Sequence, residues 1–441
     1  MGMTWASTSI GEIAEVYDGP HATPAKTANG PIFLGISNLV NGRIDLTSTE
    51  HLSEDDFVTW TRRVRPQPGD VVFSYETRLG EAALIPEGLR CCLGRRMGLL
   101  RPRANLVDSR FLLYAYLSPE FQQTLRQRTI HGSTVDRIPL IEMPSFPMRL
   151  PPLPEQRAIA AVLGALDDKI ELNRRMNATL EGLARALFKA WFVDFEPVRA
   201  KMAGRPTGLP AEIDALFPDE MEVGEEGVER PRGWRVQVLK DLVEYVIGGD
   251  WGKDERSEEF PAETYCIRGA DIPSLQGGGL GSMPSRYLKL ASLEKRSLRP
   301  GDLVVEISGG SPTQSTGRPV LVTKGLLSRL DKPLVCSNFC RLVRPQDEPT
   351  GSSASFRPGG LYQRDDFLAY ENGTTGIKNF AFTLFSEQFP LCMPPDALMR
   401  AFEKVATSLF ERMQLNGSQS DTVAKLRDAL LPKLMSGEVR V

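Results

Sequence analysis

An internal duplication is the feature that most constrains the fold of this 441-residue chain. Five landmarks recur in the same order in both halves, and their offsets drift only from 229 to 243 residues. The pairs are Trp5–Ile13 and Trp234–Leu242, Pro68–Val72 and Pro300–Val304, Leu99–Pro102 and Leu342–Pro345, Gly132–Thr134 and Gly373–Thr375, and Pro151–Pro152 and Pro394–Pro395. Matches in one order at nearly constant spacing indicate a tandem duplication. The chain is therefore expected to fold as two similar halves.

Each half has the same internal plan. A mixed segment of about 150 residues comes first, in which short strand-like runs are separated by glycine and proline. An amphipathic stretch follows, with apolar residues at three- and four-residue steps over Pro154–Phe192. This stretch predicts one helix of about 58 Å. The second copy runs from Leu398 to Leu434, and Pro432 is expected to end or bend it.

The two long helices favour an antiparallel coiled coil, because a small domain cannot cover apolar stripes of that length. In the alternative, each helix packs on its own globular neighbour. Asn173 and Asn177 lie near the centre of the first stripe. A buried amide at that place would fix the register of the helix pair, whereas a solvated amide would not.

The composition is that of a globular protein, with 41% hydrophobic and 25% charged residues. The longest apolar run, Ala158 to Leu166, is far shorter than the roughly 18 residues that cross a bilayer. No signal-peptide pattern is visible, and six cysteines are too sparse for a disulfide framework. Cys336 and Cys340 lie four apart, but all three histidines fall in the other half, which argues against zinc. We expect a cytoplasmic protein with reduced thiols and no membrane partner.

Charge is unevenly distributed along the chain. The formal net charge of −3 gives no sign of a general affinity for nucleic acid. However, residues 212–229 hold eight acids, which mask a basic region elsewhere. Residues 60–137 hold thirteen arginines, no lysine and only seven acids. Arginine in such excess favours forked contacts to phosphate or guanine, although GC-rich coding also enriches arginine.

Motifs of catalysis are missing from the sequence. There is no P-loop, and no Asn/Asp-Pro-Pro-Tyr/Phe motif beside a glycine-rich cofactor loop, as adenine methyltransferases have. Asp70 and Asp302 stand in matching Pro-Gly-Asp stretches before a strand, as acids do in some nucleases, but the required downstream lysine is missing in both copies. We expect each aspartate to hydrogen-bond its own turn. The sequence therefore predicts a chain that is not an enzyme by itself.

What remains is a pair of similar domains on a paired-helix spacer. Such an arrangement suits a long, regular ligand with two equivalent sites. B-DNA is a ligand of this kind, because it presents equivalent faces about every 34–36 Å.

The first long helix and its flanks carry a specific family resemblance. The segments concerned are Leu150–Asn173, Leu187–Phe195, Gly204–Pro210 and Pro231–Val236. They are similar to the central region of the specificity subunit of Type I restriction–modification enzymes, and the duplicated order extends the resemblance over essentially the entire chain. The second helix departs from the pattern, because Asp396–Leu398 stands where the first copy has Glu155–Arg157.

The resemblance implies an α+β fold with two similar globular target-recognition domains. Two long antiparallel helices that form a coiled coil would separate them, in a pseudo-twofold tandem duplication. The expected division is a first domain at 1–150, a central helical spacer at 151–195, an acidic Pro/Gly linker at 196–232, a second domain at 233–393 and a C-terminal helical spacer at 394–441. Each domain would read one half of an interrupted site in double-stranded DNA, and the helices would set the gap.

The resemblance also implies partners. Two DNA methyltransferase subunits would dock on the helices and flip the target adenine, and restriction subunits would join them to give an ATP-dependent endonuclease. S-adenosylmethionine, ATP and Mg would belong to those partners, so no cofactor, metal or catalytic residue is expected in this chain. The rival interpretation is a coiled-coil adaptor with two protein-binding heads and no DNA contact.

Candidate DNA contacts are polar and cationic residues of loops. The loop Gly132–Thr134 with Arg137 parallels Gly373–Thr375 with Lys378, and its hydroxyls and cation suit phosphate contacts; a turn that caps the next element is the alternative. Forked side chains suit base edges, which singles out Gln314, Arg318 and Arg78. Solvated surface charges are the alternative for the rest. The full set is Arg78, Arg95, Arg96, Ser133, Thr134, Arg137, Lys253, Arg268, Gln314, Arg318, Thr374, Thr375 and Lys378.

Overall fold

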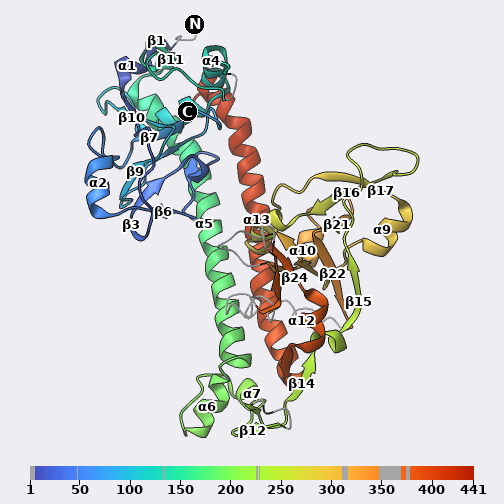
Figure 1. Ribbon diagram of the computed structural model, residues 1–441. Helices are drawn as coiled ribbons and strands as arrows, with labels where there is room; N and C mark the ends of the chain where they lie inside the picture. Colours follow the sequence, from blue (N-terminus) through green and yellow to red (C-terminus); the bar gives the residue numbers. More distant parts are fainter. Residues whose placement is uncertain are drawn as a thin grey trace. The chain divides into compact units, whose positions relative to one another are not determined.

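The computed structural model describes residues 5–46, 48–132, 135–224, 227, 229–309, 316–346, 369–373 and 378–441. The chain divides into two compact units (Figure 1). Unit 1 comprises Met1–Lys169 together with Thr422–Val441, and unit 2 comprises Ile170–Asp421. The division cuts both long helices, so each unit contains a part of each. Within the described ranges, no helix is long and apolar enough to span a membrane.

Unit 1 contains three principal small sheets. An antiparallel four-stranded sheet has the order β2-β10-β7-β8, a three-stranded sheet has the order β6-β3-β9 with β3 and β9 parallel, and β1 pairs with β11. The strands are β1 (Ala6–Ser9), β2 (Ala14–Asp18), β3 (Thr27–Leu34), β6 (Glu50–His51), β7 (Val71–Ser74), β8 (Ala82–Leu84), β9 (Cys91–Leu93), β10 (Met97–Pro102) and β11 (Pro147–Leu150). A hairpin of β4 (Leu39–Val40) and β5 (Arg43–Ile44) and the helices α1 (Ile10–Ile13), α2 (Glu54–Trp60), α3 (Ser109–Leu117) and α4 (Pro119–Arg128) complete the unit.

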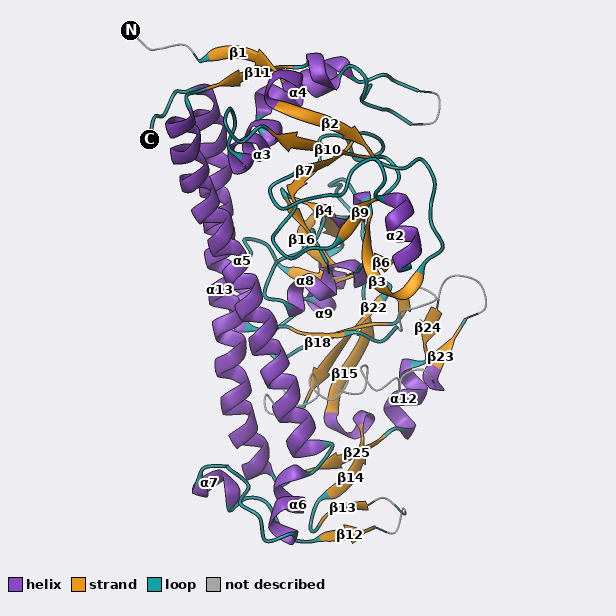
Figure 2. Cartoon of the chain, turned by 90° about the vertical axis from the view of Figure 1, so that its left-hand side faces the viewer, coloured by secondary structure: helices purple, strands orange, loops and turns teal. Residues whose placement is uncertain are grey.

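Unit 2 repeats this topology in the same chain order. Its four-stranded sheet is β15-β22-β18-β20, its three-stranded sheet is β17-β16-β21 with β16 and β21 parallel, and β14 pairs with β25 (Figure 2). The strands are β14 (Arg235–Val238), β15 (Val243–Gly248), β16 (Ala262–Ile267), β17 (Ser285–Leu288), β18 (Leu303–Glu306), β20 (Pro319–Leu321), β21 (Leu334–Cys336), β22 (Cys340–Pro345) and β25 (Pro390–Met393). The predicted tandem duplication is confirmed.

Unit 2 contains further elements. A further sheet has the order β19-β24-β23, and short helices lie between the strands; α9 follows β17 as α2 follows β6. These elements are β19 (Ser308–Gly309), β23 (Glu371–Asn372), β24 (Lys378–Phe380), α8 (Ile272–Gln276), α9 (Leu290–Arg296), α10 (Lys324–Leu327) and α12 (Phe382–Gln388).

The matching aspartates close the same turn in both units. Oδ2 of Asp70 and of Asp302 each accepts a hydrogen bond from the backbone N–H three residues earlier, at 2.8 and 2.7 Å. Each buried carboxylate also binds both Nε and Nη2 of an arginine, Arg101 in unit 1 and Arg344 in unit 2, at 2.8–3.0 Å. The prediction that these acids hold their own turns is confirmed, and the arginine partners explain why they are also buried.

The two predicted long helices are present. Helix α5 spans Leu153–Phe192, within one residue of the predicted range, and α13 spans Asp396–Ser436. Of the two outcomes expected at Pro432, an end or a bend, the end is wrong, because α13 continues through this residue to Ser436. A proline forfeits one backbone hydrogen bond. Here Leu434 and Met435, just beyond it, are buried in the core of unit 1, and this packing holds the last turn in place.

Within unit 2, α5 and α13 pack against each other in antiparallel orientation. Asn177 bonds to the carbonyl of Met413, whereas Phe188, eleven residues later, contacts the ring of Phe402 with centroids 5.9 Å apart. Partner numbers thus fall on α13 as they rise on α5. Of the two positions considered for Asn173 and Asn177, the structure shows the buried one.

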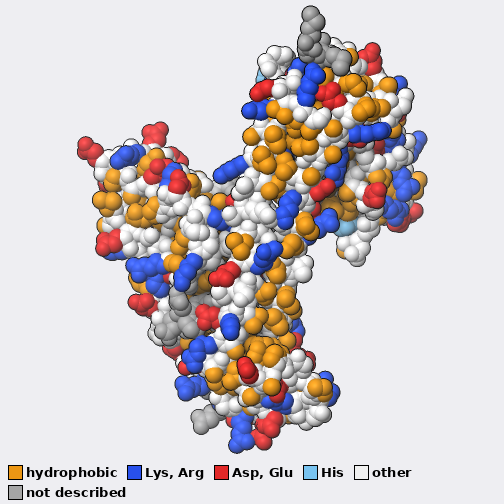
Figure 3. All heavy atoms as spheres, turned by 180° about the vertical axis from the view of Figure 1, so that it is seen from behind, with side chains coloured by type: hydrophobic (Ala, Val, Ile, Leu, Met, Phe, Trp, Pro, Cys, Tyr) orange, Lys and Arg blue, Asp and Glu red, His pale blue; other side chains and the backbone are white. Residues whose placement is uncertain are grey.

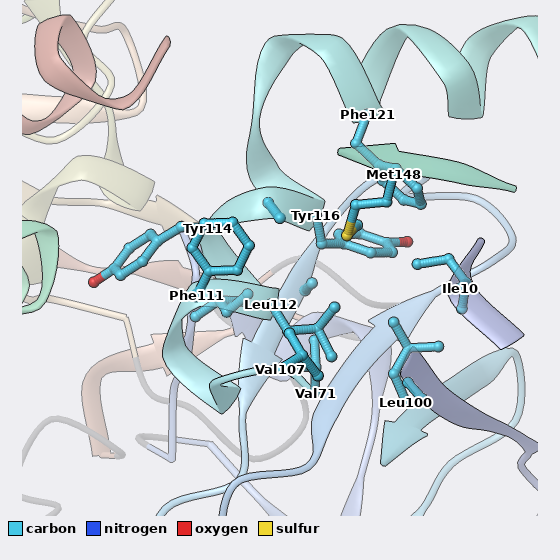
Figure 4. Close-up of a cluster of buried hydrophobic side chains, with 14 of the residues drawn as sticks. Ile10, Val71, Leu100, Val107, Phe111, Leu112, Tyr114, Tyr116, Phe121 and Met148 are labelled. Carbon is cyan, nitrogen blue, oxygen red and sulfur yellow. The ribbon is translucent and has the colours of Figure 1, made fainter. Parts of the chain in front are cut away.

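The helix ends also contribute to globular cores. The alternative interpretation, in which each helix packs on its own globular neighbour, predicted contacts of this kind. In unit 1, Ile159 and Leu163 of α5 join a cluster that also contains the aromatic side chains of α3 and α4. Figure 4 shows Phe111, Tyr114, Tyr116 and Phe121 of this cluster. The ring of Tyr114 lies in this cluster while its hydroxyl points outward and donates to Asp167 Oδ2 at 2.6 Å. Asp167 Oδ1 accepts from Arg427 of α13 at 2.8 Å, so one carboxylate ties the domain to both helices.

The segment 196–232, predicted as an acidic linker, is largely folded within unit 2. It contains α6 (Glu196–Met202), α7 (Ala211–Asp214) and a hairpin of β12 (Met221–Val223) and β13 (Glu229–Pro231). Val198 and Phe217 are buried there with Trp191 and Trp234. A few apolar residues between the acids are sufficient to fold this segment, because they pack into an aromatic cluster at the end of the helix pair.

Candidate nucleic-acid interface

Two turns occupy the same position in the duplicated fold. In unit 1 the turn Arg95–Arg96 joins β9 to β10, and in unit 2 the turn Asn338–Phe339 joins β21 to β22. The carbonyl of Arg96 accepts a hydrogen bond from Tyr75 N at 3.2 Å. At the equivalent place, the carbonyl of Phe339 accepts one from Ile307 N at 2.9 Å. The same backbone position therefore presents different side chains in the two units.

Several predicted residues of unit 1 gather around this turn. Arg96 Nε forms an ion pair with Glu76 Oε2 at 2.9 Å, and its φ of 73° is in the left-handed region. Glu76 also pairs through its backbone with Arg137, whose side chain is exposed. Arg78 donates to Glu81 at 3.1 Å and to a backbone carbonyl of the segment after β3 at 3.4 Å. Arg95 is exposed and has no recorded hydrogen bond or ion pair within the described part of the chain.

A second polar cluster lies at the end of β2 in unit 1. Asp18 accepts a hydrogen bond from the Tyr75 hydroxyl at 3.0 Å and lies 2.7 Å from His21 Nε2. Burial, and the charge of Asp18, raise the pKa of Tyr75 well above its usual value, so the tyrosine remains a donor. Beside this cluster is a pocket of about 500 Å³, whose lining includes Trp60 and the exposed Arg62 and Arg63. Two arginines, a histidine and an indole suit phosphate and base contacts.

Unit 2 has a larger pocket at its own turn. Its volume is about 600 Å³, and its lining includes Arg268, Arg318, Asn338, Phe339 and Trp251. The ring of Phe339 is unusual for its exposure, because 53% of this large apolar residue is accessible. The predicted arginines of unit 2 are thus brought together, beside three uncharged side chains that were not among the predicted residues.

Both arginines of this pocket are held by carboxylates. Arg318 binds Glu306 through Nε and Nη2 at 2.7 Å each, and only 12% of its side chain is accessible. Arg268 binds both oxygens of Asp271 at 2.9 and 3.0 Å. Burial opposes ionisation of Asp271, but hydrogen bonds from Arg268 and from a backbone N–H outweigh it and lower the pKa of Asp271. The pocket wall is therefore rigid, and Arg318 is too enclosed to reach a base edge without leaving Glu306.

The two lysines of the predicted set lie apart from the turn. Lys253 is exposed and places Nζ 5.7 Å from the ring centre of Phe260. Lys378 forms an ion pair with Glu371 at 3.1 Å and pairs in register with Gly309, which lines the pocket of unit 2.

The predicted match of Arg137 with Lys378 is off by one residue. Glu76 bridges to Arg137 in unit 1, and the corresponding Ser308 pairs with Asn379 in unit 2. The local offset is therefore 242 rather than 241, because the loops between the duplicated strands differ in length. The predicted Ser133, Thr134, Gln314, Thr374 and Thr375 lie outside the described residues.

The side chains that sequence reasoning missed are Trp251, Asn338 and Phe339 in unit 2, and His21, Trp60, Arg62 and Arg63 in unit 1. A signal was available for two of them. Adding the offset of the nearest landmark, 243, to Arg95 and Arg96 gives Asn338 and Phe339. Charge does not indicate these two positions, because the second copy carries no charged residue there.

The described residues contain no group of three or more histidine, cysteine or acidic side chains arranged to hold a metal ion. Five of the six cysteines are buried, and burial raises the pKa of Cys91, Cys92, Cys266 and Cys340 to about 12. Such thiols are poor nucleophiles and poor metal ligands at neutral pH. The two turns present exposed guanidinium, amide and aromatic groups on a hydrogen-bonded backbone, which is an arrangement that suits binding.

Comparisons with known proteins agree with this arrangement. Residues 3–182 match the Type I restriction modification DNA specificity domain. The HindI specificity subunit of Haemophilus influenzae is 27% identical over 77% of this chain and 80% of its own length. The MjaIX specificity subunit of Methanocaldococcus jannaschii is 24% identical over 99% of this chain and 90% of its own length. Residues 3–182 are therefore similar to a DNA-specificity domain, and most of the chain is similar to specificity subunits of Type I restriction enzymes.

Two solved structures of similar proteins cover nearly the whole chain. The S subunit of a Type I restriction–modification system from M. genitalium aligns over 98% of this chain and 97% of its own, with a TM-score of 0.49 and 15% identity. The HsdS subunit from Thermoanaerobacter tengcongensis aligns over 100% and 98%, with a TM-score of 0.35 and 16% identity.

Proposed function

We propose that this chain is the DNA-sequence-recognition subunit of a Type I restriction–modification complex. Each of its two duplicated domains reads one half of an interrupted site in double-stranded DNA. The chain supplies recognition and no chemistry. Methylation of adenine and cleavage belong to its partners, which bring S-adenosylmethionine, ATP and Mg.

The observation that carries this proposal is the duplicated turn with unlike side chains. Two domains of one topology present the same backbone position, but it bears two arginines in unit 1 and an asparagine and a phenylalanine in unit 2. A duplicated scaffold whose corresponding surface positions differ in chemistry is what a reader of an asymmetric, two-part sequence requires. An adaptor with two protein-binding heads has no such need, and the relatives of this chain do not favour it.

The long helices are the proposed docking site for two methyltransferase subunits, with restriction subunits joining that assembly. Leucines on both helices remain exposed, among them Leu172 and Leu183 of α5 and Leu415 of α13, with 47–63% of each residue accessible. On the face drawn in Figure 3, hydrophobic side chains reach the surface in patches between charged ones. Contiguous apolar patches on a protein surface are typical of protein–protein contacts.

Salt dependence separates DNA recognition from an adaptor role. The chain would be co-purified with the methyltransferase encoded beside it, and the Kd for a duplex would be measured between 50 and 300 mM salt. Binding through phosphates releases counterions, so log K should fall with log salt at a slope of about −0.9 per phosphate contact. A stable protein complex that shows no salt-dependent affinity for DNA would support the adaptor instead.

A domain exchange tests the division of labour. Residues 1–150 would be replaced by those of a relative with a different recognised sequence. The proposal expects one half of the recognised site to change and the other half to stay. A change in both halves would contradict the model of two independent reading domains.

A further inference from the structure

The side chains that read bases in each domain can be inferred from the duplicated turn, if the proposed function holds. The turn Arg95–Arg96 directly precedes β10, and Asn338–Phe339 directly precedes β22. In each unit these strands belong to the four-stranded sheet, while β9 and β21 belong to the three-stranded one. Each turn therefore joins the two sheets of its unit at one end.

Both turns are fixed before any ligand arrives. Besides the covalent links to two strands, the carbonyls of Arg96 and Phe339 accept hydrogen bonds from the residue that follows β7 or β18. The carbonyl of Phe339 also accepts a hydrogen bond from Ser308 N at 3.3 Å. Binding to a backbone that is already ordered costs little conformational entropy, which favours specific contacts.

The side chains on these turns differ in whether hydrogen bonds and ion pairs within the protein already hold them. Arg96 is engaged by Glu76 and by the Thr77 hydroxyl, at 2.9 and 3.3 Å, so it supports the turn rather than reaching outward. Arg95, Asn338 and Phe339 are exposed. Arg318 and Arg268, at the wall of the unit 2 pocket, are already bound to Glu306 and Asp271 and are not available as freely.

The chemistry of the three exposed side chains matches different bases. A guanidinium fork donates two hydrogen bonds to O6 and N7 of guanine, and an asparagine amide pairs with N6 and N7 of adenine. An aromatic ring packs against the methyl group of thymine. A two-residue turn between two strands has the size to enter the major groove, which admits a two-stranded ribbon.

We propose that these turns are the base-reading elements of the two domains. Arg95 reads a guanine in one half-site, whereas Asn338 reads an adenine in the other, with Phe339 against a neighbouring thymine methyl. Arg96 acts as a positioning residue for the first turn. The two half-sites thus differ because the same position in the duplicated fold carries different donors.

The test uses the chain co-expressed with its methyltransferase, and maps methyladenine across the host genome for the wild type, Arg95→Ala and Asn338→Ala. Arg95→Ala should make one guanine position degenerate in one half-site, with discrimination there falling about 10- to 100-fold. Asn338→Ala should do the same at one adenine position of the other half-site. In each case the opposite half-site should stay unchanged.

Arg126→Ala is the matched control, because Arg126 is an exposed arginine in the last turn of α4 and its loss removes the same charge. It should leave every position of the motif intact. Unchanged motifs in both turn variants, with a clear two-part motif in the wild type, would overturn this inference and leave the proposed function standing. One variant that alters both half-sites would also overturn it. Absence of any motif for the wild-type complex would overturn the proposed function and this inference with it.

Discussion

The buried amides between α5 and α13 should make a large contribution to stability. Asn177 Nδ2 donates to the carbonyls of Gly277 and Met413 at 2.9 and 3.0 Å, and its Oδ1 accepts from Asn416 Nδ2 at 2.8 Å. Asn177 and Asn416 are 3% and 2% accessible. One side chain therefore links α5, α13 and the loop after α8 within unit 2.

The expected loss of stability in Asn177→Ala follows from the polar groups that the substitution leaves without a hydrogen-bond partner. The buried amide of Asn416 and the half-buried carbonyl of Gly277 each lose this hydrogen-bond partner, and each such group costs about 1–3 kcal/mol. The sum is about 2–6 kcal/mol. A domain of 150–250 residues loses about 2–4 °C of Tm per kcal/mol, so the transition of unit 2 should fall by roughly 4–24 °C.

Thermal and urea unfolding of the full chain would measure this effect. Thr179→Ala is the control on the same helix, because Thr179 is exposed and its hydroxyl bonds only to the carbonyl of Arg175; it should change stability by less than about 0.5 kcal/mol. The double variant Asn177→Ala with Asn416→Ala should cost less than the sum of the single variants by about 0.5–3 kcal/mol, because one orphaned partner is removed. An Asn177→Ala variant as stable as Thr179→Ala would refute the assignment of a structural role to this cluster.

Three further results are expected. Asp70→Ala and Asp302→Ala should each lower the free energy of unfolding in urea by about 3 kcal/mol, because each leaves a half-buried arginine without its carboxylate and removes the hydrogen bond that closes a turn. Very unequal losses would argue against equivalent roles in the two units. Asp271 has a lowered pKa in the folded chain, so its ionised form stabilises the fold above its unfolded pKa of about 3.9, and that contribution is lost as pH falls through the folded pKa. The stability gap between the wild type and Asp271→Asn, measured from pH 6 down to pH 2.5, should therefore close below about pH 4, and a constant gap would contradict this reasoning. Native chain at pH 8 should react at no more than one of its six cysteines with a thiol reagent, since five are buried, and titration of several thiols before unfolding would show that these cores are open.

The sequence predicted the elements whose pattern is long or repeated. Helix α5 was predicted within one residue, because nearly forty residues of regular apolar spacing leave no competing interpretation. The duplication and the roles of Asp70 and Asp302 followed from landmarks that both halves share. The burial of Asn173 and Asn177 could not be decided from one helix, because it depends on which residues α13 brings opposite them.

Sequence reasoning named some residues of the candidate site and missed others, for a physical reason. Charge singled out Arg95, Arg96, Arg268 and Arg318, and the structure places the first two at a turn and the other two at a pocket. It did not show that Glu306, twelve residues before Arg318, would bind that guanidinium, since such a pair depends on the register of β18 with β20. The uncharged residues of the equivalent turn were missed because only the alignment of the two folded copies gives them a role.

The most direct test of the central claim is a methylome. The chain would be co-expressed with the methyltransferase encoded beside it, and methyladenine would be mapped across the host genome by single-molecule sequencing, with and without this chain. Recognition by two domains predicts one interrupted two-part motif that disappears when the chain is omitted. A motif that persists without the chain, or no motif from a stable purified complex, would contradict a role in DNA-sequence recognition.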